Sequence, residues 1–432
     1  MSGLEIRWPD EAAERVRAAR GRLTQAGVAL RARTLPDRLA AVARVLEDWT
    51  KADSPWRREL VESFAGTTTF SAGTVAEGLE SALRAWQPAR FVAAAEREQA
   101  CVLASSEGSR AAWSLAPYEW TALLAGGTIP MPTLLSSLLP LILGSPVLLR
   151  ETSKDPVTGR LLARSLAARD TGLARCFETI EFPFDDVHAL AAVLEAPCIV
   201  ATGTDETMRA IADRLAGHQR FVAYGHRVSI AVLGPGIATD PESVARGLAL
   251  DVVRWDQTGC LSPVVAYLVG VEVDAQRSLA CGIAQVLDTL SLSMPRGELP
   301  MATRALHGAE RASARMRAAS GKTLLIEGRD SVVVLETDAE PRPAPLHRFL
   351  RLVPLSSLAA LDGAVGGLDG ALSNVAVAGF APDEQDRLLL ELAQRGASRI
   401  TTPGQLQTPP VDWPRDGMPL FTPLARFVQR ED

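Results

Sequence analysis

One cysteine stands where a nucleophile could act. Cys260 lies in DVVRWDQTGCLSP, residues 251–263, between a predicted helical run and the strongly apolar strand VVAYLVG. Because Gly259 precedes it in a tight turn between two elements, the thiol can project from the backbone. Covalent catalysis needs such a thiol, exposed and close to backbone N–H donors. Free cysteines more often pack as small buried hydrophobes, and that alternative stays open for Cys260.

Two loops in the first half of the chain could hold the phosphates of a nucleotide. One follows PVLLR and covers residues 150–153, and the other follows CIVATG and opens a helix near Thr204. A helix N-terminus presents free N–H groups and a positive dipole end, which suits a phosphate. Thr204 would serve equally well as an ordinary N-cap, and the carboxylates of Asp205 and Glu206 disfavour an anion there. No GxGxxG fingerprint marks a standard dinucleotide fold. The candidate residues in the two loops are Arg150, Thr152, Ser153, Gly203 and Thr204.

The elements that must position these residues fall into two classes. Residues 1 to about 98 are rich in Ala, Arg, Leu and Glu with helical periodicity, so we expect helices there and no catalytic groups. From about residue 100, short apolar or β-branched runs alternate with helical stretches, which predicts an α/β protein with largely parallel sheets. The expected strands are CVLAS, AAWSLAP, SPVLLRE, CIVATG, RFVAYG, VSIAVLGPG, SPVVAYLVG, LLIEG, VVVLE, LRLVP and VAVAGF.

Two further segments have a distinctive composition. Residues 120–149 carry no charge, but their glycines and prolines would interrupt a membrane-spanning helix repeatedly. We therefore expect a loop, a short buried helix and a buried strand in this segment. The Pro-rich residues 340–345 are expected to form an exposed connection.

Length and composition narrow the functional classes. A chain of 432 residues with 47% hydrophobic content should form two or three globular domains. Its net charge of −6 argues against a nucleic-acid binder. An odd number of cysteines without CxxC spacing, together with the lack of a recognisable signal peptide, favours a reducing cytoplasm and predicts no structural metal. The five cysteines are Cys101, Cys176, Cys198, Cys260 and Cys281.

The order of these motifs resembles the aldehyde dehydrogenase superfamily. In both, a strand leads to a basic residue and a serine loop, another leads through Gly-Thr into a helix, and one cysteine follows in a turn. Within that superfamily the chain looks like the acyl-CoA reductase family, which includes the reductase of bacterial bioluminescence fatty-acid reductase complexes. The matching motifs, spread over nearly the whole chain, are GGTIPMP (126–132), VLLRETSKDPVT (147–158), GTDET (203–207), YGHRVS (224–229), DVVRWDQTGCLSP (251–263) and RITTPGQLQTPPVDWPRDG (399–417).

This resemblance implies an α/β fold of the aldehyde-dehydrogenase type, with a Rossmann-type cofactor domain and an α/β catalytic domain. It implies a helical N-terminal region at 1–98 that packs on the cofactor domain. The nicotinamide-cofactor-binding domain would cover 99–225, and the catalytic domain with the nucleophilic cysteine 226–398. The tail at 399–432 would either form part of an oligomer interface or run back to the cofactor domain.

The resemblance also implies an activity, the NADPH-dependent reduction of an acyl thioester, on coenzyme A or a carrier protein, to an aldehyde. Cys260, as thiolate, would form an acyl-enzyme that hydride converts to a thiohemiacetal, which then collapses. Superfamily members that hydrolyse their acyl-enzyme use a glutamate to activate water, and this chain has none at the comparable stretch, which ends at His226. His226 precedes Cys260 by 34 residues and could draw the thiol proton, or it could be a surface or structural residue.

Two positions depart from the family pattern. The GGTIPMP segment normally carries an asparagine whose amide stabilises the oxyanion, and Thr128 stands there instead. Its hydroxyl can donate a hydrogen bond but reaches less far. Arg150 replaces the usual lysine near the adenosine ribose, and Ser153 stands where some NAD-selective relatives have a glutamate. Arg150 and Ser153 both favour NADPH. A guanidinium can form two hydrogen bonds to a 2′-phosphate, and a serine does not repel that phosphate as a glutamate would. Arg150 could instead pair with Glu151 or Asp155 on the surface.

Two alternatives to the thioester reductase stay open. One is an acyl-phosphate reductase resembling glutamyl phosphate reductase, and the other is a non-catalytic scaffold that binds an acyl donor or a partner protein. The leading reading further implies a cytoplasmic homo-oligomer and a partner that transfers or activates acyl groups. It implies neither nucleic acid nor a membrane span.

Overall fold

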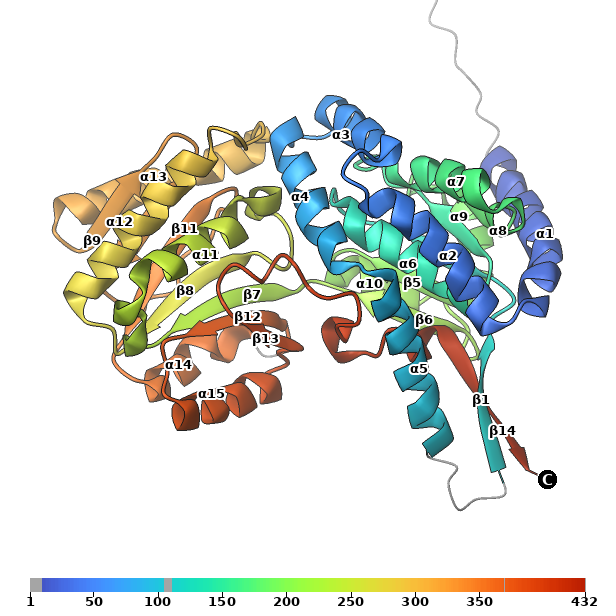
Figure 1. Ribbon diagram of the computed structural model, residues 1–432. Helices are drawn as coiled ribbons and strands as arrows, with labels where there is room; N and C mark the ends of the chain where they lie inside the picture. The colour runs from blue at the N-terminus through green and yellow to red at the C-terminus, as the bar shows by residue number, and fades with distance from the viewer. Residues whose placement is uncertain (1–9, 105–110, 369, 432) are drawn as a thin grey trace, which may run out of the picture. The chain divides into compact units, whose positions relative to one another are not determined.

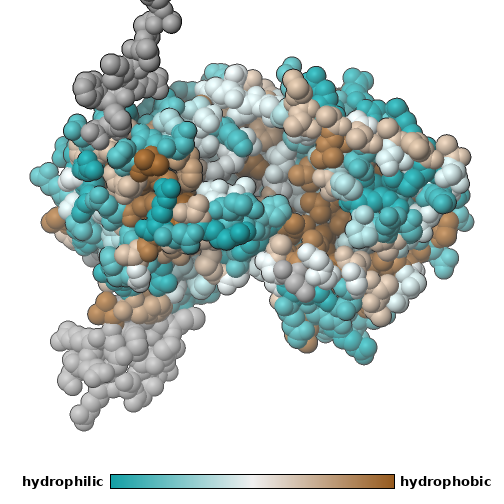
Figure 2. Space-filling view, turned by 180° about the vertical axis from the view of Figure 1, so that it is seen from behind, coloured by the Kyte–Doolittle hydropathy of each residue, from teal (hydrophilic) through white to brown (hydrophobic). Residues whose placement is uncertain are grey.

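The computed structural model describes residues 10–104, 111–368 and 370–431, and its contacts divide the chain into two units (Figure 1). The first unit comprises the residues up to 63, 86–225 and those from 418 on; the second comprises 64–85 and 226–417. Each unit has its own sheet and its own hydrophobic core. Hydrophilic residues cover much of the surface of both units in the view of Figure 2.

A five-stranded parallel sheet with the order β4-β3-β2-β5-β6 forms the centre of the first unit. Counted along the chain, these strands lie in the order 3-2-1-4-5, which is the arrangement of dinucleotide-binding folds. The order reverses between β2 and β5, so the loops that leave these two strands flank a crevice position. The strands are β2 (Thr121–Leu124), β3 (Val147–Arg150), β4 (Phe177–Ile180), β5 (Cys198–Thr202) and β6 (Arg220–Tyr224).

Helices pack on this sheet because their apolar residues recur at helical spacing. In the first helix, Ala13, Val16 and Leu23 are buried against a cluster that includes the fully buried Trp120. Separately from the sheet, β1 (Ala111–Pro117) pairs antiparallel with β14 (Ala425–Glu431). The helices of this unit are α1 (Asp10–Ala32), α2 (Leu35–Thr50), α3 (Pro55–Thr67, which crosses the unit boundary), α5 (Pro88–Ala104), α6 (Pro130–Leu143), α7 (Thr158–Arg169), α8 (Thr171–Ala174), α9 (Val187–Val193) and α10 (Asp205–Ala212), with the short η5 (Thr422–Leu424).

A seven-stranded sheet with the order β13-β12-β7-β8-β11-β10-β9 forms the second unit. Its strands pair in parallel except β9, which is antiparallel to β10. The strands are β7 (Val228–Leu233), β8 (Pro263–Val269), β9 (Thr323–Glu327), β10 (Val332–Glu336), β11 (Phe349–Leu355), β12 (Leu372–Ala378) and β13 (Arg399–Thr401). The helices are α4 (Ala72–Ala85), α11 (Pro241–Val253), α12 (Val273–Leu290), α13 (Met301–Ala319), α14 (Leu358–Val365) and α15 (Pro382–Gln394), with the short η1 (Pro235–Thr239), η2 (Arg254–Gln257), η3 (Gly366–Leu368) and η4 (Arg415–Gly417).

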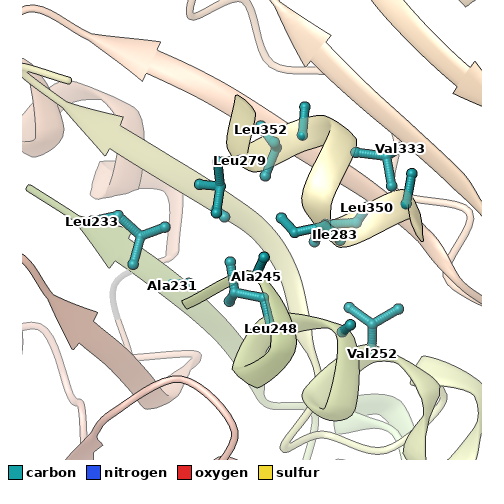
Figure 3. Packing of buried hydrophobic residues seen from close by; sticks show 14 of the residues in the cluster. Ala231, Leu233, Ala245, Leu248, Val252, Leu279, Ile283, Val333, Leu350 and Leu352 are labelled. Atoms are coloured by element: carbon teal, nitrogen blue, oxygen red, sulfur yellow. The ribbon is translucent and has the colours of Figure 1, made fainter. Parts of the chain in front are cut away.

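The core of the second unit lies between this sheet and the pair α11 and α12 (Figure 3). Leu248 and Val252 of α11 and Ile283 of α12 point toward the strands, as side chains four residues apart on one helix face do. Residues of α14 and α15 pack with strand residues in a second cluster, which includes Leu361 and Leu388. The sheet is therefore covered on both faces, which explains why its strands read as continuous apolar runs.

The structure confirms most of the elements expected from the sequence. Residues 10–98 are largely helical, and every expected strand but one is present. The expected strand CVLAS is wrong, because residues 101–104 complete α5, whose Ala- and Glu-rich sequence favours helix. The segment 120–149 opens with a strand, β2, and continues with the buried α6 and β3. Residues 340–345 form a connection without helix or strand, in which three of the six residues are exposed, two are half-buried and Pro345 is buried.

The contact-based division differs from the expected domain ranges at two places. Residues 64–85 group with the second unit, because α4 approaches it closely: a Cβ on Gly73 would lie 2.1 Å from the Ser293 carbonyl oxygen, and one on Gly78 2.4 Å from the Trp255 ring. The expected tail is also split, since residues up to 417 belong to the second unit and those from 418 to the first.

A membrane-spanning helix and a metal site were both considered for the residues that the structure describes. Among these residues, no helix is both long and apolar enough to cross a membrane. The same residues include no group of three or more His, Cys, Asp or Glu side chains placed to hold a metal ion.

Candidate active site

The turn that leads to Cys260 begins with three residues in the left-handed region. Trp255, Asp256 and Gln257, in η2, have φ angles of 52°, 49° and 60°. None is glycine, and a backbone in this region costs roughly 1–3 kcal/mol per residue. All three residues are buried, so contacts inside the protein must hold them in place.

A second left-handed turn holds the first. Residues 346–348 have φ angles of 59°, 50° and 67°. The fully buried Arg348 guanidinium donates to the Asp256 carboxylate at 2.8 and 2.5 Å. The Gln257 side-chain amide donates to the Phe349 carbonyl at 3.2 Å and accepts from the Phe349 N–H at 2.9 Å. Hydrogen bonds between ionised groups are roughly twice as strong as neutral ones, so this ion pair offsets part of the backbone strain.

Cys260 follows at the N-terminal edge of the sheet. It is exposed, and its carbonyl oxygen accepts a 2.6 Å hydrogen bond from the Ser229 hydroxyl at the start of β7. Ser229 pairs with Pro263, the first residue of the adjacent strand β8. Because His226 lies two residues before β7, the structure brings it to the same edge as Cys260, and it too is exposed.

Charges around Cys260 act on its thiol in opposite directions. Desolvation by the surrounding protein raises the pKa of the Cys260 thiol above its ordinary value of 9.0. Arg415 and, to a lesser degree, Arg227 lower that pKa, whereas Asp416 raises it. Solvent thus reaches the residue, yet the protein around the thiol removes part of its hydration. The thiol is therefore mainly protonated at neutral pH, and its reaction as a nucleophile requires a base.

The other cysteines differ from Cys260 in environment. Cys176 and Cys198 are buried, and desolvation raises their pKa values to about 11 and about 12. Cys281 is exposed on α12, outside any turn. The side chain of Cys101 lies outside the described residues. Of these four cysteines, Cys260 alone is both exposed and placed in a turn that buried hydrogen bonds fix.

In the first unit, Arg150 ends β3 at the carboxyl edge of the parallel sheet. Its guanidinium donates to the Phe182 carbonyl at 2.9 Å and lies 5.5 and 5.4 Å from the ring centres of Phe182 and Phe184. Burial lowers the pKa of Arg150, and its Nε has no hydrogen-bond partner. The pairing with Glu151 or Asp155 considered from the sequence is not what holds it.

The loop after Arg150 combines buried and exposed polar groups. Glu151 is buried and forms a 3.0 Å ion pair with Arg160, while its Oε1 has no partner. Desolvation is the main reason that the pKa of Glu151 is raised. Thr152 is buried and its hydroxyl accepts from the Lys154 N–H, whereas Ser153 is exposed at the tip.

The loops after β2 and β5 meet at the point where the strand order reverses. A Cβ on Gly126 would lie 2.0 Å from the Thr202 carbonyl oxygen, so only glycine allows this approach. Thr128 is half-buried in the loop after β2. Gly203 follows β5, and Thr204 caps α10 by accepting from the Thr207 N–H at 3.3 Å. The capping role is thus present; a phosphate there stays a prediction.

Comparison with known proteins shows the family of this chain. A family model, acyl-CoA reductase (LuxC), matches residues 32–430. The chain belongs to the acyl-CoA reductase (LuxC) family. The long-chain acyl-protein thioester reductase of Vibrio harveyi is 22% identical over 320 residues, which are 73% of this chain and 65% of that protein. The chain's match therefore spans just under two thirds of the length of this curated relative.

Solved structures show the fold. Methylmalonate-semialdehyde dehydrogenase from Oceanimonas doudoroffii has a TM-score of 0.71 at 13% identity, over 97% of this chain and 90% of that one. Glyceraldehyde-3-phosphate dehydrogenase from Methanocaldococcus jannaschii, complexed with NADP, has a TM-score of 0.70 at 10% identity, over 97% and 95% of the two chains. The expected aldehyde-dehydrogenase-like fold is confirmed.

Within each unit of this acyl-CoA reductase family member, the structure gathers the residues expected from the sequence at one sheet edge. Arg150, Thr152, Ser153, Thr128, Gly203 and Thr204 follow three adjacent parallel strands of the first unit, and His226 joins Cys260 in the second. Sequence reasoning missed the residues that hold the turn, Ser229, Arg348 and Gln407. Two of them lie in motifs that the sequence analysis names, Ser229 in YGHRVS and Gln407 in RITTPGQLQTPPVDWPRDG.

Proposed function

We propose that this protein reduces an acyl thioester, carried by coenzyme A or by a protein, to an aldehyde with NADPH as the hydride donor. The observation that carries the proposal is the exposed Cys260 thiol on a turn fixed by buried polar contacts, in a member of the acyl-CoA reductase family. A free thiol held this way suits nucleophilic attack on a carbonyl carbon.

The first half of the reaction transfers the acyl group to the protein. His226 takes the proton of Cys260, whose raised pKa leaves little thiolate at neutral pH. The thiolate attacks the carbonyl carbon and forms a C–S bond, and the oxyanion accepts a hydrogen bond from the Cys260 N–H. Thr128, which the family resemblance aligns with the oxyanion-binding asparagine, would donate a second hydrogen bond. The bond to the carrier sulfur then breaks, and the carrier leaves as a thiol with the proton from His226.

The second half requires a cofactor, and the loop after β3 has groups that fit one. Arg150 would hold the 2′-phosphate with Ser153 beside it, and the unpartnered Arg150 Nε and Glu151 Oε1 suit the donors and acceptors of a ribose. Gly203 and Thr204 would lie against the pyrophosphate at the α10 N-terminus. NADPH, when bound, supplies the hydride that reduces the acyl carbon.

Cys260 then releases the product. The thiohemiacetal oxyanion on Cys260 collapses as its C–S bond breaks, which frees the aldehyde and leaves the Cys260 thiolate, and a proton from solvent restores the thiol. The stretch before β7, residues 222–226, has no glutamate to activate water, so the acyl-cysteine persists until it is reduced. Hydrolysis to an acid should therefore be slow.

Intact-mass measurement with a panel of acyl-CoA and acyl-carrier thioesters tests the proposal. We expect an acyl adduct on Cys260 and, with NADPH, an aldehyde. Cys260→Ala should abolish both, whereas Cys281→Ala, the matched change at the other exposed cysteine, should leave both intact. Turnover retained in Cys260→Ala would rule out the covalent route.

The same panel separates the alternatives. The acyl-CoA reductase family match favours a thioester over an acyl phosphate. Aldehyde formed from acyl phosphates but not from thioesters would show the phosphate-reductase alternative. Binding of an acyl donor with no adduct and no NADPH binding would show the scaffold, for which Thr128 in place of asparagine is the best argument.

A further inference from the structure

One buried side chain joins both ends of the segment that carries Cys260. This nucleophile segment runs from Asp251, near the end of α11, to Ser262, just before β8. The Gln407 side-chain nitrogen donates to the Asp251 carbonyl at 3.2 Å and, at shorter range, to the Ser262 hydroxyl. Gln407, Asp251 and Ser262 are all at least 95% buried. The two hydrogens of one amide therefore tie the beginning of the segment to its end.

The loop that carries Gln407 is itself fixed on α11. The N–H groups of Gly404 and Leu406 donate to the Asp251 carboxylate at 2.6 and 3.0 Å. Gly404, at φ 89°, needs a residue without a Cβ, and a Cβ on Gly247 of α11 would lie 2.6 Å from the Pro403 backbone. This close approach of two backbones sets the position from which Gln407 reaches the nucleophile segment.

Other contacts hold the middle of the segment, and at its end the Ser262 N–H donates to the Gly259 carbonyl at 3.0 Å, so Gln407 adds the side-chain contact there. Arg348 and Phe349 hold Asp256 and Gln257, and the Ser229 hydroxyl holds the Cys260 carbonyl. After Cys260, the backbone must leave the turn and enter β8. The Ser262 side chain is anchored there by Gln407, so that contact limits how far Cys260 can rotate.

We propose that Gln407 is a positioning residue for Cys260, which acts by closing the nucleophile segment and so orienting the thiol and its own backbone N–H. This inference rests on the proposed role of Cys260 as the nucleophile. Removing the amide leaves the Asp251 carbonyl and the Ser262 hydroxyl buried without this donor. The segment then relaxes, and displacement of a reacting atom by about 1 Å can slow a reaction about 10²-fold.

The test compares Gln407→Leu, which keeps the size of the side chain, with Gln405→Leu, whose exposed glutamine lies two residues earlier. We expect Gln407→Leu to slow single-turnover acylation of Cys260 about tenfold or more, with little change in KM. It should also lower the ratio of Cys260 to Cys281 labelling by iodoacetamide. Gln405→Leu should leave the acylation rate and the ratio at wild-type values.

Ser262→Ala removes the hydroxyl that accepts the hydrogen bond from Gln407. This variant tests the positioning role even if Gln407→Leu fails to fold. It should lower the same labelling ratio, and the double variant should be no slower than Gln407→Leu alone, because one interaction is lost in both. The proposal would be overturned if Gln407→Leu and Ser262→Ala both fold and both show a ratio of Cys260 to Cys281 labelling at or above that of the wild type.

Iodoacetamide labelling also separates this inference from the proposed function. The labelling needs neither thioester nor NADPH. A lowered ratio in a protein that forms no aldehyde would leave the positioning role standing and reject the reductase. Normal labelling and acylation per folded molecule, with only a lower Tm, would show that Gln407 is merely structural and would reject the positioning role.

Discussion

At the scale of single residues, the charge beside Cys260 should set how much thiolate is present. Desolvation raises the pKa of this thiol, and Arg415 opposes the rise. Because the pKa is raised, the thiolate fraction is small at neutral pH and grows as the pH rises past the ordinary value of 9.0. The rate of alkylation at Cys260 should therefore keep rising above that pH.

Removing the positive charge of Arg415 should shift the pH dependence of Cys260 alkylation to higher pH. Arg415→Gln is expected to raise the pKa of Cys260 further and to slow iodoacetamide labelling at about pH 8 by about two- to threefold. Arg227→Gln should have a smaller effect, because Arg227 contributes less and lies 3.7 Å from Asp416. Labelling of Arg415→Gln at the wild-type rate would show that its charge does not reach the thiol.

Thr128 is the second residue whose chemistry can be tested alone. If its hydroxyl stabilises the oxyanion, Thr128→Val keeps the shape and should slow single-turnover acylation of Cys260 about tenfold or more, toward the ~10²–10³ that a full donor contributes. Thr128→Asn restores the amide that the family usually carries and should accelerate the step. Unchanged NADPH binding serves as the control for folding. An unchanged acylation rate in Thr128→Val would show that the hydroxyl does not face the carbonyl.

At the scale of elements, the end of β3 presents Arg150 as the proposed anchor of the 2′-phosphate. Phe182 and Phe184 hold its guanidinium in one orientation. Arg150→Ala should therefore reduce the preference for NADPH over NADH about tenfold, measured as the ratio of the two Kd values. Arg164→Ala, on α7 and paired with Glu59, provides the control. Equal affinities for both cofactors in the wild type would remove the basis of this assignment.

Helix α5 and the segment before β14 are joined by one carboxylate. Glu98 accepts hydrogen bonds from the N–H groups of residues 420–422 and from the Thr422 hydroxyl, at 2.6–3.2 Å. Glu98→Gln replaces one acceptor oxygen by a donor that faces these N–H groups. We expect a loss of about 1–3 kcal/mol in the free energy of unfolding by urea. Glu96→Gln, exposed on the same helix, should change it little. Equal stabilities of the two variants would contradict this role.

At the scale of the whole molecule, stability should depend on pH through Asp251. Burial raises the pKa of Asp251 from 3.8 to about 7, despite its hydrogen bonds to Gly404 and Leu406. Between these values the folded protein holds more protons than the unfolded chain, so the free energy of unfolding falls as the pH rises from about 4 to about 7. The gap corresponds to roughly 4 kcal/mol.

Urea unfolding at several pH values measures this slope. Asp251→Asn cannot ionise and should flatten it, whereas Asp274→Asn, an exposed carboxylate on α12, should leave it unchanged. The same fall of stability with pH in Asp251→Asn as in the wild type would mean that other groups cause it.

The sequence by itself determined the features that depend on local pattern. Helical periodicity placed the N-terminal helices, and short apolar runs placed most strands, because buried parallel strands are apolar throughout. Gly259 and the apolar run after Cys260 located the turn. The expected strand CVLAS is part of a helix instead, since a short apolar run at the end of a helix has no distinguishing period.

The tertiary structure alone decided what holds the nucleophile turn. Arg348 reaches Asp256 from 92 residues away, and Gln407 reaches Ser262 across 145. No local preference predicts three consecutive left-handed residues without glycine, because only partners distant in sequence stabilise them. The grouping of residues 64–85 with the second unit has the same origin, since close backbone contacts with Ser293 and Trp255 form only when the chain has folded.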